Sequence, residues 1–295
     1  MAAHAEKTAA AVAPERNAAP WTPELTWGAI LLIPYITVFF LFVVWPVGYG
    51  VWLGRDPDSY RRLLADPVYL RTVWNTAAFL GIGVNLKLFL ALILSAYFMS
   101  QRPWIRWLSI LFILPWAVPS IPTILSFRWM LNSEWGMLNG MLWDFFRIEG
   151  PYWLVDPKLA LSSAIAVHIW KYLPFWTLIL MAGRSAIPTD YYEAARIDGA
   201  SRMQMFAYVT WPQIRNLYVT STLLSTIWTL GDFNSIYLLT GGGPNELTHV
   251  LATLGVRYAF RLQELDMGVA TVMTALPILV PLVFILIRRL GGRVE

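Results

Sequence analysis

The chain has 295 residues, of which 57% are hydrophobic and 14% are charged, and its mean hydropathy is +0.54. A soluble domain carries about 25% charged residues, so these charges are too few to coat a water-soluble surface, and we predict an all-α membrane protein. The net charge of +4 is spread over short loops, which argues against nucleic acid as a partner. The absence of cysteine excludes disulfides, thiolate metal sites and a cysteine nucleophile.

Residues 1–27 are rich in alanine with scattered proline, and we predict a flexible cytoplasmic tail there. They lack the ordered basic, apolar and small-residue regions of a secretory signal peptide. About six apolar runs follow, each near the roughly 20 residues that a membrane-spanning helix needs. They predict a transmembrane domain over residues 28–290, with spans at about 28–53, 72–98, 105–131, 159–181, 217–239 and 267–287.

The third run contains three internal prolines, Pro115, Pro119 and Pro122. Each proline removes a helix hydrogen bond and kinks the helix, and neighbouring helices can satisfy the freed carbonyl inside a membrane. We therefore predict a bent span here. Whether the bend serves packing or gating stays open.

An even number of spans places both termini on the same side of the membrane. The loops on that side carry the larger share of the Lys and Arg residues, so the positive-inside rule predicts cytoplasmic termini. Under this topology residues 291–295 form a second, short cytoplasmic tail.

A long polar stretch, residues 183–215, separates the fourth and fifth predicted spans. Asp190 and Glu193 have the spacing of a capping box, and Ser201 and Gln204 repeat it, so we predict two short helices. Gly199 between them suits a left-handed helix end, where a side chain would clash. An ordinary amphipathic loop at the membrane surface explains the same spacing, and the pattern alone does not decide between the two.

The segment EAARIDGA at residues 193–200, followed by Phe206 and by Trp211–Pro212, resembles the signature of type I ABC importer permeases. The segments ILPWAVPSIPTILSFRWMLNSEWGMLN, WKYLPFW and FNSIYLLTGGGP resemble the carbohydrate-uptake branch of that family. The likeness runs from about Gly28 to Arg289. Two positions depart from the family pattern: Trp211 stands where leucine is usual, and Asn216 stands where a second proline often follows.

This resemblance implies the type I permease fold, with residues 183–215 as a coupling loop seated in a cleft of a cytoplasmic ATPase. Glu193 would pair with a basic group of the ATPase, Ala194 and Ala195 would permit close packing, and Gly199 would set the bend. The residues that the resemblance assigns to coupling are Glu193, Ala194, Ala195, Asp198, Gly199, Phe206 and Pro212.

The resemblance also implies partners. These are a second, related permease subunit, two cytoplasmic ATPase subunits and an extracytoplasmic solute-binding protein, assembled in the inner membrane of a bacterium. The chain has no phosphate-binding loop of its own, because the glycine-rich Gly241–Pro244 lacks the required lysine. We therefore expect no catalytic residue, metal or cofactor in this chain, and ATP with Mg²⁺ on the partner ATPases.

Ionisable residues inside the predicted spans are candidates for the solute pathway. A charge at a helix centre costs roughly 2.5–3.5 kcal/mol, so such residues usually face a bundle interior or a wet cavity. They either line a solute cavity or pair with one another for structure, for instance a lysine with the aspartate. With softer amide, hydroxyl and aromatic candidates included, the set is Lys87, His168, Lys171, Trp228, Asp232, Asn234 and Ser235.

The expected function is import of a sugar or sugar-derived solute by alternating access, and the buried lysines are compatible with an anionic one. A permease of the same family for a non-sugar solute is the nearest alternative. A polytopic membrane enzyme has less support, because His4, His168 and His249 form no metal-ligand pattern. An ion channel would carry a filter-like repeat or rings of charge, and the sequence has neither.

Overall fold

The computed structural model describes residues 23–100 and 102–291, and every regular element in these residues is helical. The chain divides into two compact units, residues 1–52 and 53–295. The type of fold predicted from the sequence, an all-α protein with long apolar helices, is confirmed.

The first unit is one apolar helical run. It consists of α1 (Pro23–Phe39), a π-helical turn η1 (Phe40–Val44) and α2 (Trp45–Leu53). Taken by itself, this unit buries no residue of its apolar window, so these side chains need a cover of lipid or of protein outside the unit. The predicted tail overlaps this run, since residues 23–27 are helical, and residues 1–22 lie outside the described residues.

The second unit contains all the remaining described helices. The first six are α3 (Pro57–Ala65), α4 (Pro67–Phe98), α5 (Pro103–Ala117), α6 (Ser120–Met130), α7 (Met137–Phe146) and α8 (Ala160–Ser185). The next four elements are α9 (Thr189–Ile197), α10 (Arg202–Met205), the π-helical turn η2 (Phe206–Thr210) and α11 (Trp211–Leu230). The last five are α12 (Asn234–Tyr237), α13 (Leu251–Val256), η3 (Arg257–Arg261), α14 (Leu265–Met273) and α15 (Leu276–Gly291), and residues 292–295 lie outside the described residues.

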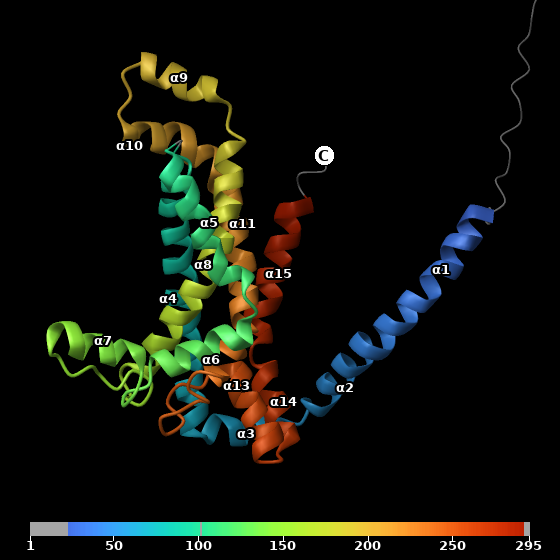
Figure 1. The fold of residues 1–295 in the computed structure, drawn as a ribbon. Helices are drawn as coiled ribbons and strands as arrows, with labels where there is room; N and C mark the ends of the chain where they lie inside the picture. The colour runs from blue at the N-terminus through green and yellow to red at the C-terminus, as the bar shows by residue number, and fades with distance from the viewer. Residues whose placement is uncertain (1–22, 101, 292–295) are drawn as a thin grey trace, which may run out of the picture. The chain divides into compact units, whose positions relative to one another are not determined.

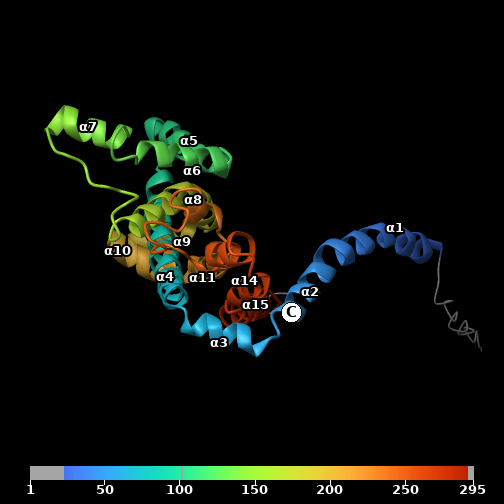
Figure 2. The same cartoon turned by 90° about the horizontal axis from the view of Figure 1, so that it is seen from below.

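The helices α4, α8 and α11 lie side by side at the centre of the second unit (Figure 1). Leu88 and Ala91 of α4 form one buried cluster with Trp176 and Leu180 of α8. The short helices α9 and α10 lie at one end of this bundle, and α3, α13 and α14 lie at the other (Figure 1). In the view from below, α5, α6 and α7 gather on one flank of α8 (Figure 2). The bundle therefore separates α9 and α10 from α3, α13 and α14.

Three single helices of the described residues are long and apolar enough to cross a membrane: Thr26–Leu53, Pro67–Phe98 and Ala160–Ser185. Two bent pairs, α5 with α6 and α14 with α15, also qualify if each counts as one span. The fifth predicted span, 217–239, corresponds to α11, which has 20 residues but is not apolar enough to meet the same criterion. Its Ser221, Ser225 and Thr229 are buried, so these polar groups face protein rather than lipid. That span stays a prediction.

The helix α4 begins at Pro67, before the start predicted for the span 72–98. The Asp66 carboxylate accepts a hydrogen bond from the backbone N–H of Val68 at 2.7 Å. Pro67 stands in the first turn, where its missing N–H costs nothing. The hydroxyl of Tyr258 also donates to Asp66. A capping aspartate followed by proline therefore extends the helix beyond its apolar run.

The predicted bend in 105–131 is confirmed, because α5 and α6 meet at 99°. Val118 and Pro119 are extended between them, which leaves the last carbonyls of α5 without helical donors. Lys171 of α8 supplies a donor: its Nζ lies 2.6 Å from the carbonyl oxygen of Pro115 and 3.4 Å from that of Trp116, and it also donates to Val118. The lysine caps the broken helix.

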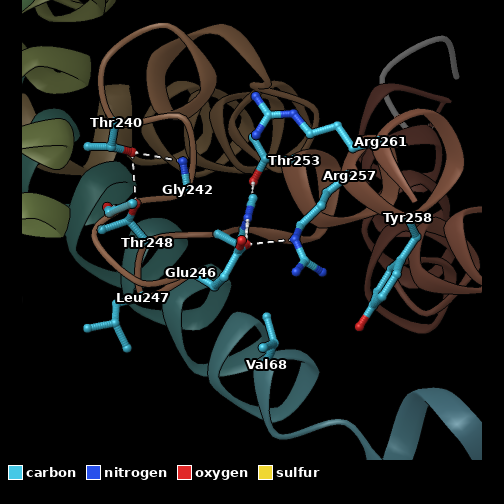
Figure 3. A network of polar contacts seen from close by, with 12 residues as sticks. Val68, Thr240, Gly242, Glu246, Leu247, Thr248, Thr253, Arg257, Tyr258 and Arg261 are labelled. Carbon is cyan, nitrogen blue, oxygen red and sulfur yellow. Dashed lines mark hydrogen bonds and ion pairs between the residues drawn. The ribbon is translucent and has the colours of Figure 1, made fainter. Parts of the chain in front are cut away.

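A polar network fastens the loop between α12 and α13 to the rest of the unit (Figure 3). His249 is 2% exposed, and its Nε2 lies 2.6 Å from Oε2 of Glu246, which also lies 2.8 Å from Nε of Arg257. The Nδ1 atom of His249 contacts the Thr253 hydroxyl at 3.0 Å. Asn75 of α4 donates to the carbonyl of His249 at 2.9 Å. The loop is therefore attached to α4 through its own backbone.

The pKa of His249, which lies outside the spanning segments, is below its ordinary value. Burial lowers this pKa, and it outweighs the raising effect of the hydrogen bond and charge of Glu246. Arg257 and Arg261 lower the pKa further. The folded protein therefore favours the neutral imidazole.

Replacing Lys171 with methionine should lower the free energy of unfolding by about 1–3 kcal/mol, because carbonyls at the end of α5 lose their donor. The matched control is Lys158→Met, which removes an exposed lysine just before the same helix and should change stability by no more than about 0.5 kcal/mol. Denaturant unfolding of both variants in detergent measures the difference. Equal effects of the two substitutions would contradict the capping role.

His249 should make stability depend on pH. Its native pKa lies below the unfolded value of about 6.5, so the unfolded chain binds the proton more readily, and stability is lost as the pH falls below about 6.5. His249→Gln removes this titration and should flatten the fall of the thermal unfolding midpoint between about pH 7.5 and about pH 5.5. The same slope in wild type and variant would show that His249 does not contribute.

Candidate functional site

Three buried polar side chains from three segments form a relay at the centre of the bundle. Lys87 lies in α4, His168 lies in α8, and Asp232 lies just beyond the end of α11. Nζ of Lys87 is 2.9 Å from Nε2 of His168, and Nδ1 of His168 is 2.7 Å from Oδ2 of Asp232. Their side chains are nearly inaccessible, since Lys87 is 1%, His168 2% and the Asp232 side chain 7% exposed.

The hydrogen-bonding capacity of each group assigns the protons in this relay. An ammonium only donates hydrogen bonds, and a carboxylate only accepts them. His168 therefore accepts at Nε2 from Lys87 and donates from Nδ1 to Asp232, which is the arrangement of one neutral tautomer. The imidazole connects a cation to an anion, and the relay as a whole has no net charge. This matters because an unpaired charge at such a depth is strongly destabilising.

Asp232 also organises the first turn of α12. Its Oδ1 accepts a hydrogen bond from the backbone N–H of Ser235 at 3.1 Å, and its Oδ2 accepts one from the Ser235 hydroxyl at 2.5 Å. Asn234, the first residue of α12, stands between them in the chain. The relay therefore fixes the position of the segment that carries Asn234.

A cavity of about 300 Å³ adjoins the relay, within the size range of small-molecule sites. Trp228 contributes an aromatic face, with its ring centre 5.5 Å from those of Trp176 and Phe175. The buried hydroxyl of Ser225 has no hydrogen-bond partner among the described residues. The side chains that line the cavity include Lys87, His168, Tyr172, Trp176, Ser225, Trp228, Thr229, Asp232, Phe233 and Asn234.

The structure brings together most of the predicted pathway residues. Lys87, His168, Trp228, Asp232 and Asn234 all line the cavity. The Ser235 hydroxyl donates a hydrogen bond to Asp232. Lys171 does not join them, because its ammonium group caps α5. Lys87 and Asp232 do not contact each other directly; each contacts His168, which lies between them.

Several lining residues were not predicted from the sequence, although helical spacing indicates them. Tyr172 and Trp176 follow His168 at intervals of four on α8, so all three share one face. Ser225 and Thr229 have the same four-residue interval on α11. These four side chains are uncharged, so they do not stand out when candidates are chosen by charge inside a predicted span.

The two short helices predicted within 183–215 are present, with one correction at the start of the first. The helix α9 begins directly after Pro188 and has no side-chain cap, so the capping box predicted at Asp190 and Glu193 is wrong. Pro188 itself has the extended backbone of a residue that precedes a helix, with φ −56° and ψ 139°. Gly199 is left-handed as predicted, with φ +75°, a conformation that costs other residues roughly 1–2 kcal/mol.

The second predicted capping box is confirmed, because Ser201 and Gln204 exchange both of its hydrogen bonds. The helix that it starts is not isolated. From α10 the chain continues through η2, which begins at Phe206, into α11, where Pro212 stands in the first turn. The Tyr192 hydroxyl of α9 contacts that of Thr210 at 2.9 Å. The stretch 183–215 therefore continues directly into α11, and a hydrogen bond between side chains also holds α9 to the turn before α11.

The predicted coupling residues differ in exposure. Glu193, Ala194, Asp198 and Gly199 are exposed, and Ala195 is half-buried. Large apolar side chains stand beside them, with Ile197 87% and Met203 75% exposed. Phe206 is half-buried, and the guanidinium of Arg184 lies 5.7 Å from its ring centre. The surface of α9 and α10 therefore presents charged groups of both signs beside large apolar groups, and exposed apolar groups of this kind mark interaction surfaces.

Among residues 23–100 and 102–291, no group of three His, Asp or Glu side chains is arranged to hold a metal ion.

Comparison with known proteins gives consistent matches over the length of the chain. The trehalose/maltose transport system permease protein of Thermococcus litoralis is 30% identical over 283 residues, which cover 92% of this chain and 95% of the relative. The sulfoquinovosyl glycerol transport system permease protein of Agrobacterium fabrum is 31% identical over 298 residues, covering 93% and 96%.

The fold is also that of a solved transporter. A chain of a bacterial alginate ABC transporter, crystallised with an alginate-bound periplasmic protein, superimposes with a TM-score of 0.75 at 21% identity, covering 88% of this chain and 92% of its own. The family model of the binding-protein-dependent transport system inner membrane component matches residues 87–294. The chain therefore belongs to this family and is a multi-pass inner-membrane permease subunit of an ABC transporter.

Proposed function

We propose that this chain forms half of the translocation pathway of an ATP-driven sugar importer and works by alternating access. The cavity beside the relay carries the proposal, because it combines the aromatic faces of Trp176 and Trp228 with the amide of Asn234 and the buried hydroxyl of Ser225. Ligand sites typically join apolar and aromatic walls to a few convergent polar groups. The names of the two sequence relatives, one for disaccharides and one for a sulfonated sugar derivative, support a sugar-like solute.

The charge of the cavity favours a neutral solute. The sequence is compatible with an anionic solute only if Lys87 or Lys171 offers an unbalanced positive charge to the cavity. Lys171 instead caps α5, and Lys87 is balanced by Asp232 through His168. An anion would enter a site with no net positive charge to offset its loss of hydration. We propose a neutral saccharide, and an anionic or non-sugar solute is the alternative.

We propose that residues 183–215 couple this chain to a cytoplasmic ATPase subunit. Glu193 is exposed on α9, so its carboxylate is free to meet a basic group. Gly199 sets the bend, Asp198 stands beside it, and the small Ala194 and Ala195 allow close approach. Phe206 and Pro212 lie where α10 continues into α11, which ends beside the cavity. A displacement of the stretch would therefore be transmitted along α11.

The remaining partners follow from the same proposal. A second, related permease supplies the other half of the pathway, two ATPase subunits bind ATP and Mg²⁺, and an extracytoplasmic binding protein delivers the solute. Residues 28–290 then form the permease domain, with both termini in the cytoplasm. The chain itself performs no catalysis, and the transporter character of its relatives supports this.

Replacing Glu193 with alanine should reduce the ATPase stimulation by solute-loaded binding protein about tenfold, which is within the usual range of coupling free energies. The matched control, Asp190→Ala, removes another exposed carboxylate of α9 to which the family resemblance gives no role, and it should couple normally. ATPase activity of the assembled complex in proteoliposomes, measured with a panel of neutral and acidic sugars, gives the result and names the solute. Normal coupling by an assembled Glu193→Ala complex would exclude the proposed contact.

A further inference from the structure

We infer that Asp232 sets the charge selectivity of the solute cavity: by balancing Lys87 through His168, it keeps the cavity neutral and excludes anionic sugars. This inference rests on the proposed function of the cavity as a solute site. The fold and the shape of the cavity do not determine whether a neutral or an anionic solute is preferred; the carboxylate of Asp232 does.

The first observation is the charge on the cavity wall. Among the described residues that line it, only Lys87 and Asp232 are charged with His168 neutral. The two charges are joined by a single imidazole at 2.9 and 2.7 Å. A change in either residue therefore changes the net charge of the whole cavity by one.

The second observation is that Lys87 has a hydrogen-bond donor to spare. Its ammonium group has three N–H donors. One points to His168, a second lies 3.5 Å from the hydroxyl of Thr229, and the ring centre of Tyr172 is 5.7 Å away. Among the described residues the third donor has no hydrogen-bond partner, and Lys87 lines the cavity, so it can bind a hydroxyl oxygen while its charge is balanced by Asp232.

An anionic solute in this cavity would lie near both charges of the relay. In a site of low dielectric constant, a carboxylate or sulfonate near the relay is attracted by Lys87 and repelled by Asp232, so it recovers little of the hydration it has lost. Asparagine has nearly the same shape as aspartate and can still accept from His168 through its oxygen. In Asp232→Asn, no carboxylate of the protein balances the ammonium form of Lys87, and the carboxylate of an anionic solute can take that place.

The test uses two probes that differ in one group. Methyl β-glucoside has a hydroxymethyl group at the position where methyl β-glucuronide has a carboxylate. Binding of each to the purified complex in nanodiscs, without binding protein and at constant ionic strength, is measured by calorimetry. We expect wild type to prefer the glucoside, and Asp232→Asn to shift the affinity ratio at least tenfold toward the glucuronide.

Three variants make the comparison specific. Glu246→Gln is the matched control, because Glu246 also contacts a buried histidine, His249, but lies outside the cavity, and its affinity ratio should equal that of wild type. Lys87→Met should shift the ratio in the opposite direction, and it decides the matter if Asp232→Asn does not assemble. The double variant Lys87→Met with Asp232→Asn restores neutrality and should regain the preference for the glucoside.

The inference is overturned if Asp232→Asn keeps the wild-type ratio within twofold, if Glu246→Gln shifts it equally, or if wild type prefers the glucuronide. Absence of binding of both probes to every variant overturns the proposed solute role of the cavity, and the inference with it. Glucoside binding with an unchanged ratio leaves the solute role intact and removes only the selectivity assigned to Asp232.

Discussion

A lysine, a histidine and an aspartate, buried together between α4, α8 and the end of α11, are the interaction on which the centre of this unit depends. Lys87 and Asp232 cannot each be buried alone without a large penalty, and His168 lies between them as the group that accepts from one and donates to the other. The three segments are therefore held at one relative position. The cavity exists where they meet, and its polar and aromatic lining follows from that position.

The same helices connect the two ends of the unit. α8 carries His168 in its first half and Arg184 near its end, where the guanidinium lies over the ring of Phe206. α11 continues from η2, next to the proposed coupling stretch, to the turn that holds Asp232. If the stretch couples as proposed, α11 is the element that carries its displacement toward the relay. The Tyr192–Thr210 contact strengthens this connection.

Apolar length and motif spacing predicted the helical membrane fold, the bend after Pro115 and the left-handed Gly199, because each depends on local chemistry. The capping box at Asp190 failed since Pro188 already provides the extended residue before the helix. Within the site, buried charge pointed to Lys87, His168 and Asp232, which the structure brings together, and their role in a solute pathway stays a prediction. For Lys171 it left a cavity role and a structural role open, because the contacts that decide between them are with carbonyls of a helix 50 residues or more away in sequence. Long-range contacts of this kind depend on how helices pack, which spacing within one helix does not report.

The most direct measurement is a double-mutant cycle between Lys87→Met and Asp232→Asn, with the free energy of unfolding of each variant determined in the same detergent. If the relay holds the bundle, each single variant leaves an uncompensated buried charge, and the double variant is more stable than either, with a coupling energy of about 1–3 kcal/mol. Additive effects, within about 0.5 kcal/mol, would contradict the account, because the two charges would then contribute independently.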